Sequence, residues 1–153
     1  MPEFTIQIDA SPERVFEELS HVERHPSWAN PKSVMTMQQT GGEGPGATST
    51  YRSTGVFTGK AVSADITVTR FDPPRAFSIR SEQHQEGKKD AWYVNDYTLR
   101  PQGDGTLVTK KLTGSLSPVV FALAHFAIKK DAMTSLRNLK GRLESPDAGG
   151  GTV

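Results

Sequence analysis

The chain has 153 residues, with 18 basic and 17 acidic side chains and a formal net charge of +1. Such a balance gives no general attraction for nucleic acid or anionic lipid, and the absence of cysteine excludes disulfides, thiolate metal sites and cysteine nucleophiles. No apolar run approaches the roughly 20 residues of a membrane span, and no basic-then-apolar secretory signal opens the chain, so we expect a cytoplasmic protein.

The chain begins with a predicted strand and a capped helix. Apolar and polar residues alternate over residues 4–8, which is the period of a strand. Ser11 is then a good N-cap and Pro12 a good first helical residue, because proline misses no hydrogen bond there. The helix that follows carries one apolar stripe, formed by Val15, Phe16 and Leu19.

A second short helix is expected over residues 21–25, with Pro26 ending it. His21 and His25 stand four residues apart, which is the spacing of paired zinc ligands on a helix, and Glu17 or Glu18 would be the third ligand. Most such pairs are solvated helix faces, and the proline ends the turn at once. We therefore expect no metal and no cofactor.

Between residues 32 and 113 the pattern is that of strands joined by turns rich in glycine and proline. The predicted strands are Ser33–Gln39, Thr48–Val56, Lys60–Phe71, Ala76–Gln85, Ala91–Arg100 and Thr106–Thr113. Short connections imply antiparallel neighbours. With the opening strand, the sequence predicts a seven-stranded antiparallel sheet.

One long helix is predicted to close the domain, from Val119 to Leu143. At 100° per residue a single apolar face gathers Phe121, His125, Ile128, Ala132, Leu136, Leu139 and Leu143. The segment 145–153 has little to bury and is expected to be disordered. We thus expect one domain over residues 1–144.

Several segments resemble the START-domain and polyketide cyclase superfamily, and in particular its polyketide cyclase/dehydrase-like members. The segments are residues 9–16 after the first strand, 25–28, 44–48 with Tyr51 and Arg52, 71–78, and 97–101 before 105–109. The resemblance implies an α+β helix-grip fold, in which a curved seven-stranded antiparallel sheet surrounds a long C-terminal helix and two small helices follow the first strand. It also implies a ligand-sized cavity between sheet and helix.

The strand at 91–100 offers two faces, and its inward residues are predicted to be Tyr93, Asn95, Tyr97 and Leu99. The opposite phase would bury the carboxylate of Asp96, which is costly without a partner. Hydrogen-bonding groups along an apolar wall are typical of ligand pockets. The alternative is that the tyrosines are core residues and that the backbone satisfies Asn95.

The other predicted ligand contacts come from neighbouring strands and helices, and they are Tyr51, Ile66, Phe77, Trp28 and His125. Trp28 suits either the mouth of the cavity or the core beneath the small helices. His125 suits either a ligand contact or a core histidine. Arg52 is solvated if Tyr51 faces inward, or it enters the cavity as an anion clamp if the register slips at a bulge. The paired lysines at 88–89, 110–111 and 129–130 are interpreted as edge and surface protection.

The function predicted from these features is binding of a hydrophobic or aromatic small molecule, as a carrier or sequestering protein and as a monomer or homodimer. The first alternative is a polyketide aromatase/cyclase that closes a poly-ketone by aldol chemistry and dehydration, for which His125 and Tyr93 are the weak catalytic candidates. The second alternative is a stress-related module that binds a protein partner and holds no ligand.

Overall fold

A computed structural model describes residues 2–29, 35–57 and 59–145. In chain order the elements are β1 (Glu3–Ile8), α1 (Pro12–Ser20), the 3-10 helix η1 (Val22–Ser27), β2 (Met35–Gly41), β3 (Thr50–Phe57), β4 (Lys60–Asp72), β5 (Ala76–Gln85), β6 (Ala91–Gln102), β7 (Gly105–Gly114), α2 (Pro118–Leu123) and α3 (His125–Glu144). Residues 33–34 of the predicted second strand and residues 146–153 of the predicted tail lie outside the described residues.

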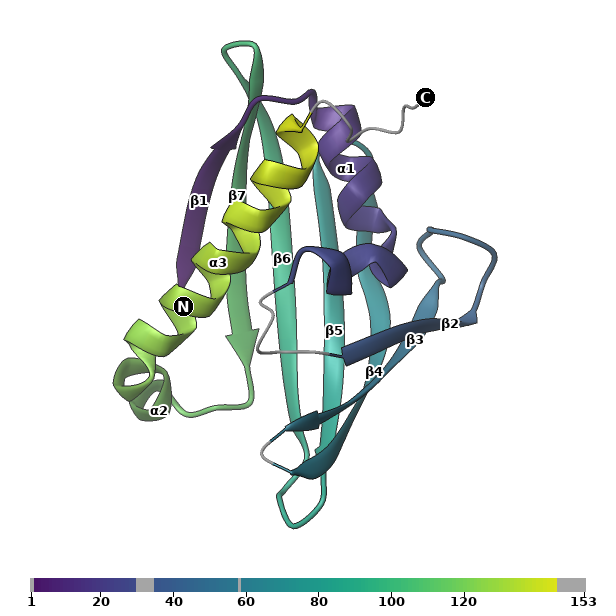
Figure 1. The fold of residues 1–153 in the computed structure, drawn as a ribbon, viewed down its shortest axis with the longest axis vertical. Helices are drawn as coiled ribbons and strands as arrows, with labels where there is room; N and C mark the ends of the chain where they lie inside the picture. Colours follow the sequence, from purple (N-terminus) through teal and green to yellow (C-terminus); the bar gives the residue numbers. More distant parts are fainter. Residues whose placement is uncertain (1, 30–34, 58, 146–153) are drawn as a thin grey trace.

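Seven strands form one antiparallel sheet in the order β1-β7-β6-β5-β4-β3-β2 (Figure 1). The sheet curves, and α1, η1 and α3 lie on its inner side. The predicted α+β helix-grip architecture is therefore confirmed.

Serine followed by proline begins both α1 and α2. The hydroxyl of Ser11 accepts from the backbone N–H of Arg14 at 3.3 Å, and the hydroxyl of Ser117 accepts from that of Val120 at 3.2 Å. In each case the proline takes the first helical position, where its missing donor costs nothing. The predicted cap at Ser11 is confirmed.

The second small helix departs from its prediction. It is a 3-10 helix that runs through Pro26 to Ser27, so the expectation that Pro26 ends it was wrong. The N–H groups of Trp28 and Ala29 both donate to the carbonyl of His25, so this last turn requires no donor from Pro26. The turn carries the indole of Trp28 into the core.

The closing helix is not continuous. Ala124 leaves helical geometry, with φ −91° and ψ 6°, and separates α2 from α3. No glycine or proline marks the break in the sequence. Phe121 is buried on α2, whereas Leu123 and Phe126 on either side of the break are 82% and 85% exposed.

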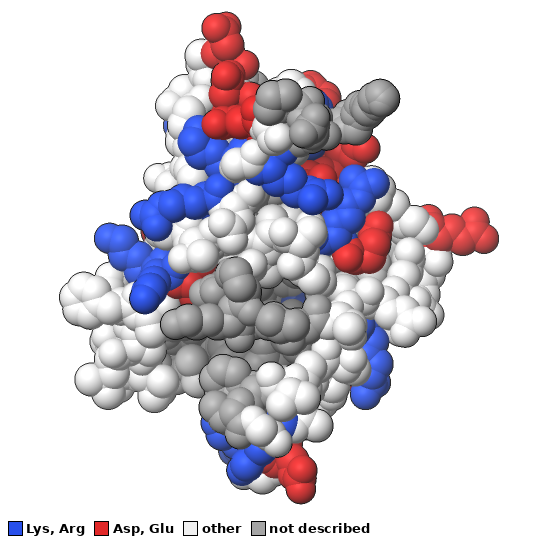
Figure 2. Space-filling view, in the orientation of Figure 1, with Lys and Arg blue, Asp and Glu red and all other residues white. Residues whose placement is uncertain are grey.

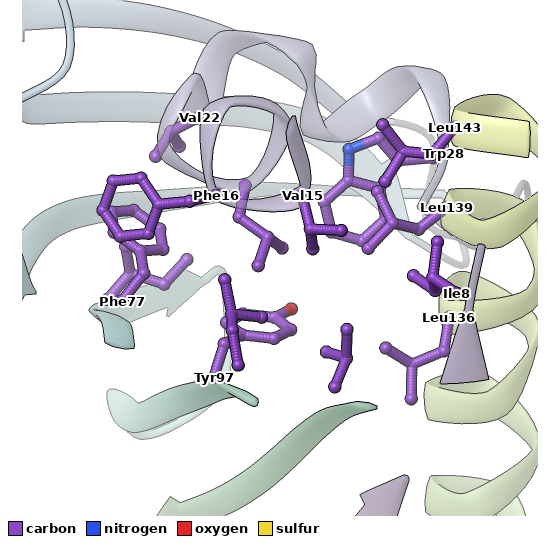
Figure 3. Close-up of a cluster of buried hydrophobic side chains, with 14 of the residues drawn as sticks. Ile8, Val15, Phe16, Val22, Trp28, Phe77, Tyr97, Leu136, Leu139 and Leu143 are labelled. Atoms are coloured by element: carbon purple, nitrogen blue, oxygen red, sulfur yellow. The ribbon is translucent and has the colours of Figure 1, made fainter. Parts of the chain in front are cut away.

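The solid part of the core lies where α1 and α3 meet the sheet (Figure 3). Its fully buried side chains include Ile8, Val15, Leu19, Phe77, Val108, Leu136 and Leu139. These are the apolar stripes of two helices pressed against the inward residues of the strands. Over the described residues, no helix is long and apolar enough to cross a membrane.

Candidate functional site

The residues of β6 that face the inner side of the sheet are those that the sequence predicts. Tyr97 and Leu99 are buried, while Thr98 between them is exposed. Asp96 lies on the opposite face, where it accepts a hydrogen bond from the hydroxyl of Ser78. The carboxylate thus has a hydrogen-bond partner and lies away from the inner face of the sheet, where burying it unpaired would be costly.

Residues from four strands share one level of the inner face. Tyr51 pairs with Ile66, which pairs with Ser81, and Ser81 pairs with Tyr93. Because side chains alternate along a strand, residues paired directly across strands point to the same side. The sheet therefore brings Tyr51, Ile66 and Tyr93 to one surface, with Asn95 two residues farther along β6.

The helices leave part of this surface uncovered. Among the strands, α3 makes its main backbone approach to β1, at the edge of the sheet, and α1 covers β5, β6 and β7. Tyr93 and Asn95 are only half-buried, although they belong to the same row as the buried Tyr97. Figure 2 shows Lys and Arg side chains gathered along the path of α3 on this side of the molecule.

Gly114 allows Tyr93 to lie flat against the neighbouring strand. The two residues are paired between β6 and β7, and a Cβ added at Gly114 would fall 2.6 Å from the Cδ1 atom of the tyrosine ring and 2.8 Å from the carbonyl oxygen of Trp92. Real Cβ atoms do not approach so closely. The absence of a side chain at Gly114 thus permits the close approach of the Tyr93 ring.

Three buried polar atoms on the inner side have no hydrogen-bond partner among the described residues: the hydroxyls of Tyr51 and Ser53 and the indole nitrogen of Trp28. Burial raises the pKa of Tyr51, and the nearby Ser49 hydroxyl only partly opposes this effect. Burial also raises the pKa of Tyr93. Both phenols are consequently protonated hydrogen-bond donors at neutral pH.

Two aromatic side chains in contact come from His25 of η1 and from Trp28, the residue that follows this helix. The rings of His25 and Trp28 lie 4.6 Å apart, and Figure 3 shows the indole beside Leu139 and Leu143. The Nε2 of His25 donates to the carbonyl of Leu19 at 2.7 Å, and burial lowers the pKa of this imidazole to about 4. Of the two interpretations of Trp28, the structure favours the core position, since only 3% of the residue is exposed.

The predicted zinc ligands are both bonded to backbone instead. The Nδ1 of His21 lies 2.6 Å from the carbonyl oxygen of Glu17, and His25 is bonded as described above. Glu18 forms ion pairs with Arg24 and Arg142. Within the described part of the chain, no group of three or more histidine, aspartate or glutamate residues could hold a metal ion.

His125 is not brought together with the other predicted contacts. It is the first residue of α3 and is exposed, with its ring against that of Phe126, so the expected place at the centre of a buried face was wrong. Figure 1 shows the first turns of α3 overhanging the β1 edge of the sheet, where no strand covers this helix face. The half-buried Ile128 is the first residue of α3 that packs against the core.

Phe77 lies on the inner face but belongs to the solid core, where its ring meets Phe16 and Phe71 edge to face. Arg52 does not enter the cavity. Strand β3 keeps its register opposite β4, so Arg52 stays on the outer face and its guanidinium lies 3.2 Å from the carboxylate of Asp65. The bulges occur in β2 and β4 instead.

Lys110 is an inner-face residue that the sequence interpretation missed. It pairs with Tyr97 across β6 and with Phe4 across β1, and its ammonium lies 5.7 Å from the centre of the Tyr97 ring. Its predicted role as surface protection was wrong, because the side chain is half-buried among inward residues. Its charge also contributes to the lowered pKa of His25 on η1.

A separate pocket of about 450 Å³ is lined by Arg75, Thr98, Leu99, Arg100, Pro101, Leu107 and Thr109. The exposed positions Thr98 and Arg100 belong to the outer phase of β6. This pocket therefore does not lie between the sheet and the C-terminal helix, where the predicted ligand contacts lie.

The family described as polyketide cyclase/dehydrase and lipid transport matches residues 3–144. The chain belongs to this family. Its membership places the chain in the helix-grip superfamily, as the resemblance implied. No curated protein matches the sequence.

Solved structures confirm the fold of this family member. A protein from Arthrobacter aurescens has 14% identity and a TM-score of 0.68, with 95% of this chain and 87% of that chain covered. Ara h 8.0201 has 14% identity and a TM-score of 0.64, covering 93% and 95%. The di-domain ARO/CYC StfQ of the steffimycin biosynthetic pathway has 14% identity and a TM-score of 0.66, covering 94% of this chain and 44% of StfQ.

Proposed function

We propose that this family member binds a hydrophobic or aromatic small molecule in the hollow between the sheet and α3, and that it acts as a carrier or sequestering protein of the cytoplasm. The observation that carries the proposal is the pair of buried hydroxyls on the inner face of β3, those of Tyr51 and Ser53, which have no hydrogen-bond partner among the described residues. An unsatisfied buried donor costs about 1–3 kcal/mol, which a ligand acceptor would recover.

The half-buried part of the inner face supports the same proposal. Tyr93 and Asn95 continue the row of Tyr97 beyond the solid core, and the helices leave them partly uncovered. A ligand that covered them would gain about 25 cal/mol for each Å² of apolar surface removed from water. The polar ends of both side chains would orient it.

Binding can be measured with N-phenylnaphthylamine, an uncharged dye whose fluorescence rises in apolar surroundings. We expect saturable binding by the wild-type protein and at least tenfold weaker binding by Asn95→Phe, in which the larger side chain fills the hollow. Val94→Phe is the matched control, because Val94 is also half-buried but points to the opposite face. Absence of saturable binding, or equal binding by both variants, would contradict the proposal.

Native mass spectrometry of freshly purified protein tests the proposal without a chosen dye. A co-purified small molecule that is retained by Val94→Phe and lost from Asn95→Phe would be bound in the hollow.

The cyclase alternative is tested by the Tyr93→Phe variant. A cyclase needs a group that transfers a proton within reach of the bound ketone. With His125 exposed on α3, Tyr93 is the remaining candidate of the two. A poly-ketone that cyclises faster with the wild-type protein than with the variant, at equal dye affinity, would favour the enzyme over the carrier.

A further inference from the structure

The inner face carries one cation that the packing of the fold does not explain. Along β7 the residues that face inward are Thr106, Val108, Lys110 and Leu112, because each pairs with an inward residue of β6 or β1. An ammonium group at such a position loses part of its hydration, and this loss is unfavourable unless an anion or an acceptor replaces the water.

The cross-strand neighbours of Lys110 supply no anion. Tyr97 on one side and Phe4 on the other are aromatic and buried, and at 5.7 Å the Tyr97 ring gives only a cation–π contact. Among the residues the structure describes, no carboxylate lies within 4.0 Å of the Lys110 ammonium. A cation–π contact of this kind contributes about 0.5–1 kcal/mol when exposed, less than a charged hydrogen bond does.

The titratable groups of η1 and α1 on this side are neutral or already paired. His25 on η1 is held neutral by burial, which its hydrogen bond to Leu19 only partly opposes, and the positive charge of Lys110 further lowers its pKa. The inner carboxylate of α1 is that of Glu18, and it is engaged by Arg24 and Arg142. Neither of these two helices therefore offers a free carboxylate to Lys110, and Asp131 of α3 is exposed to solvent.

We propose that Lys110 binds an anionic oxygen of the ligand, so that the ligand class is an organic acid with an apolar or aromatic body and a carboxylate. This inference rests on the proposed function, because it concerns the same hollow. The carboxylate accepts from the Lys110 ammonium, while the apolar body covers the Tyr93–Asn95 part of the inner face. The exposed neighbour Lys111 points to the opposite side and takes no part.

Two isosteric competitors test the proposal: naphthoate, which is ionised at neutral pH, and the uncharged naphthamide. Each displaces N-phenylnaphthylamine from the wild-type protein, and we expect naphthoate to bind about tenfold more tightly, the factor that one charged hydrogen bond supplies. Lys110→Met should abolish this preference and leave naphthamide unaffected. Lys110→Arg should keep the preference, and Lys111→Met is the control with the same change of net charge.

The outcomes separate the two proposals. If the dye does not bind or neither competitor displaces it, the proposed hollow itself is wrong. If both competitors bind equally to the wild type, or if Lys110→Met retains the preference for naphthoate, the hollow stands and the role of Lys110 is wrong. If Lys110→Met loses the native near-ultraviolet circular dichroism signal, and so does not fold correctly, Lys110→Gln is used in its place.

Discussion

Acid should destabilise this fold through one buried imidazole, that of His25. Its pKa falls from 6.5 to about 4, chiefly because burial removes water from the ring; the hydrogen bond to Leu19 opposes the shift, and the charge of Lys110 adds to it. Between these two pH values the unfolded chain binds a proton that the native protein refuses. Stability is therefore fully present above pH 6.5 and is lost as the pH falls towards 4.

The size of the effect follows from the two pKa values of His25. Proton linkage with 6.5 in the unfolded chain and about 4 in the native protein gives a loss of about 2 kcal/mol between pH 7 and pH 5. The complete shift corresponds to about 3 kcal/mol below pH 4. Such a loss is a large fraction of the 5–15 kcal/mol that is typical of a native domain.

Urea unfolding at pH 7, 6 and 5 measures this loss. His25→Gln removes the titration but retains an N–H that can reach the Leu19 carbonyl, so its stability at pH 7 should be lower and its decline towards pH 5 shallower by about 2 kcal/mol. His21→Gln is the control, because its imidazole lies outside the core. The carboxylates titrate equally in all three proteins. A decline in His25→Gln as steep as that of the wild type would refute the reasoning.

Two further predictions concern the helices. Leu136→Ala on α3 should lower the free energy of unfolding by about 2–5 kcal/mol, because this side chain is fully buried. Leu123→Ser at the α2–α3 break should change it by less than about 0.5 kcal/mol, because Leu123 is exposed. Both values can be measured by chemical denaturation. An equal cost at both positions would mean that the helix is continuous and packed along its whole length. Arg142→Met should cost about 1–2 kcal/mol at neutral pH, since it removes the guanidinium that lies 3.1 Å from the nearly buried carboxylate of Glu18. Glu18→Gln in the same background should recover part of that loss in thermal melts, and an unchanged loss would exclude the ion pair as its cause.

The alternation of side chains along the strands was the most informative feature of the sequence for predicting which residues face the inner side of the sheet. Over β6 it assigned the inward residues correctly, because the opposite phase would bury the carboxylate of Asp96, which is costly without a partner. The break at Ala124 was not predictable in the same way, since both helices continue one apolar period and no glycine or proline interrupts it. The exposure of His125 follows from where the sheet ends, which local sequence does not encode.

Lys110 could have been found from the sequence. In β7 both phases contain a lysine, so alternation alone does not choose between Lys110 and Lys111. The two-residue turn after Gln102 decides which lysine faces inward. It pairs Gln102 with Gly105, and the same register places Tyr97 opposite Lys110. An inward tyrosine at position 97 then requires an inward lysine at position 110.

The polar groups of the hollow bear on the choice between carrier and cyclase. The Lys110 ammonium donates hydrogen bonds and accepts none, and the raised pKa of Tyr93 keeps its phenol protonated. The imidazole of His25 is neutral, but its ring is buried and bonded to backbone. In the proposed function these donors orient a ligand through the oxygen atoms that accept their hydrogen bonds. A carrier needs nothing more, whereas the cyclase alternative requires Tyr93 or another group of this chain to transfer a proton at the bound ketone, and the Tyr93→Phe assay distinguishes the two.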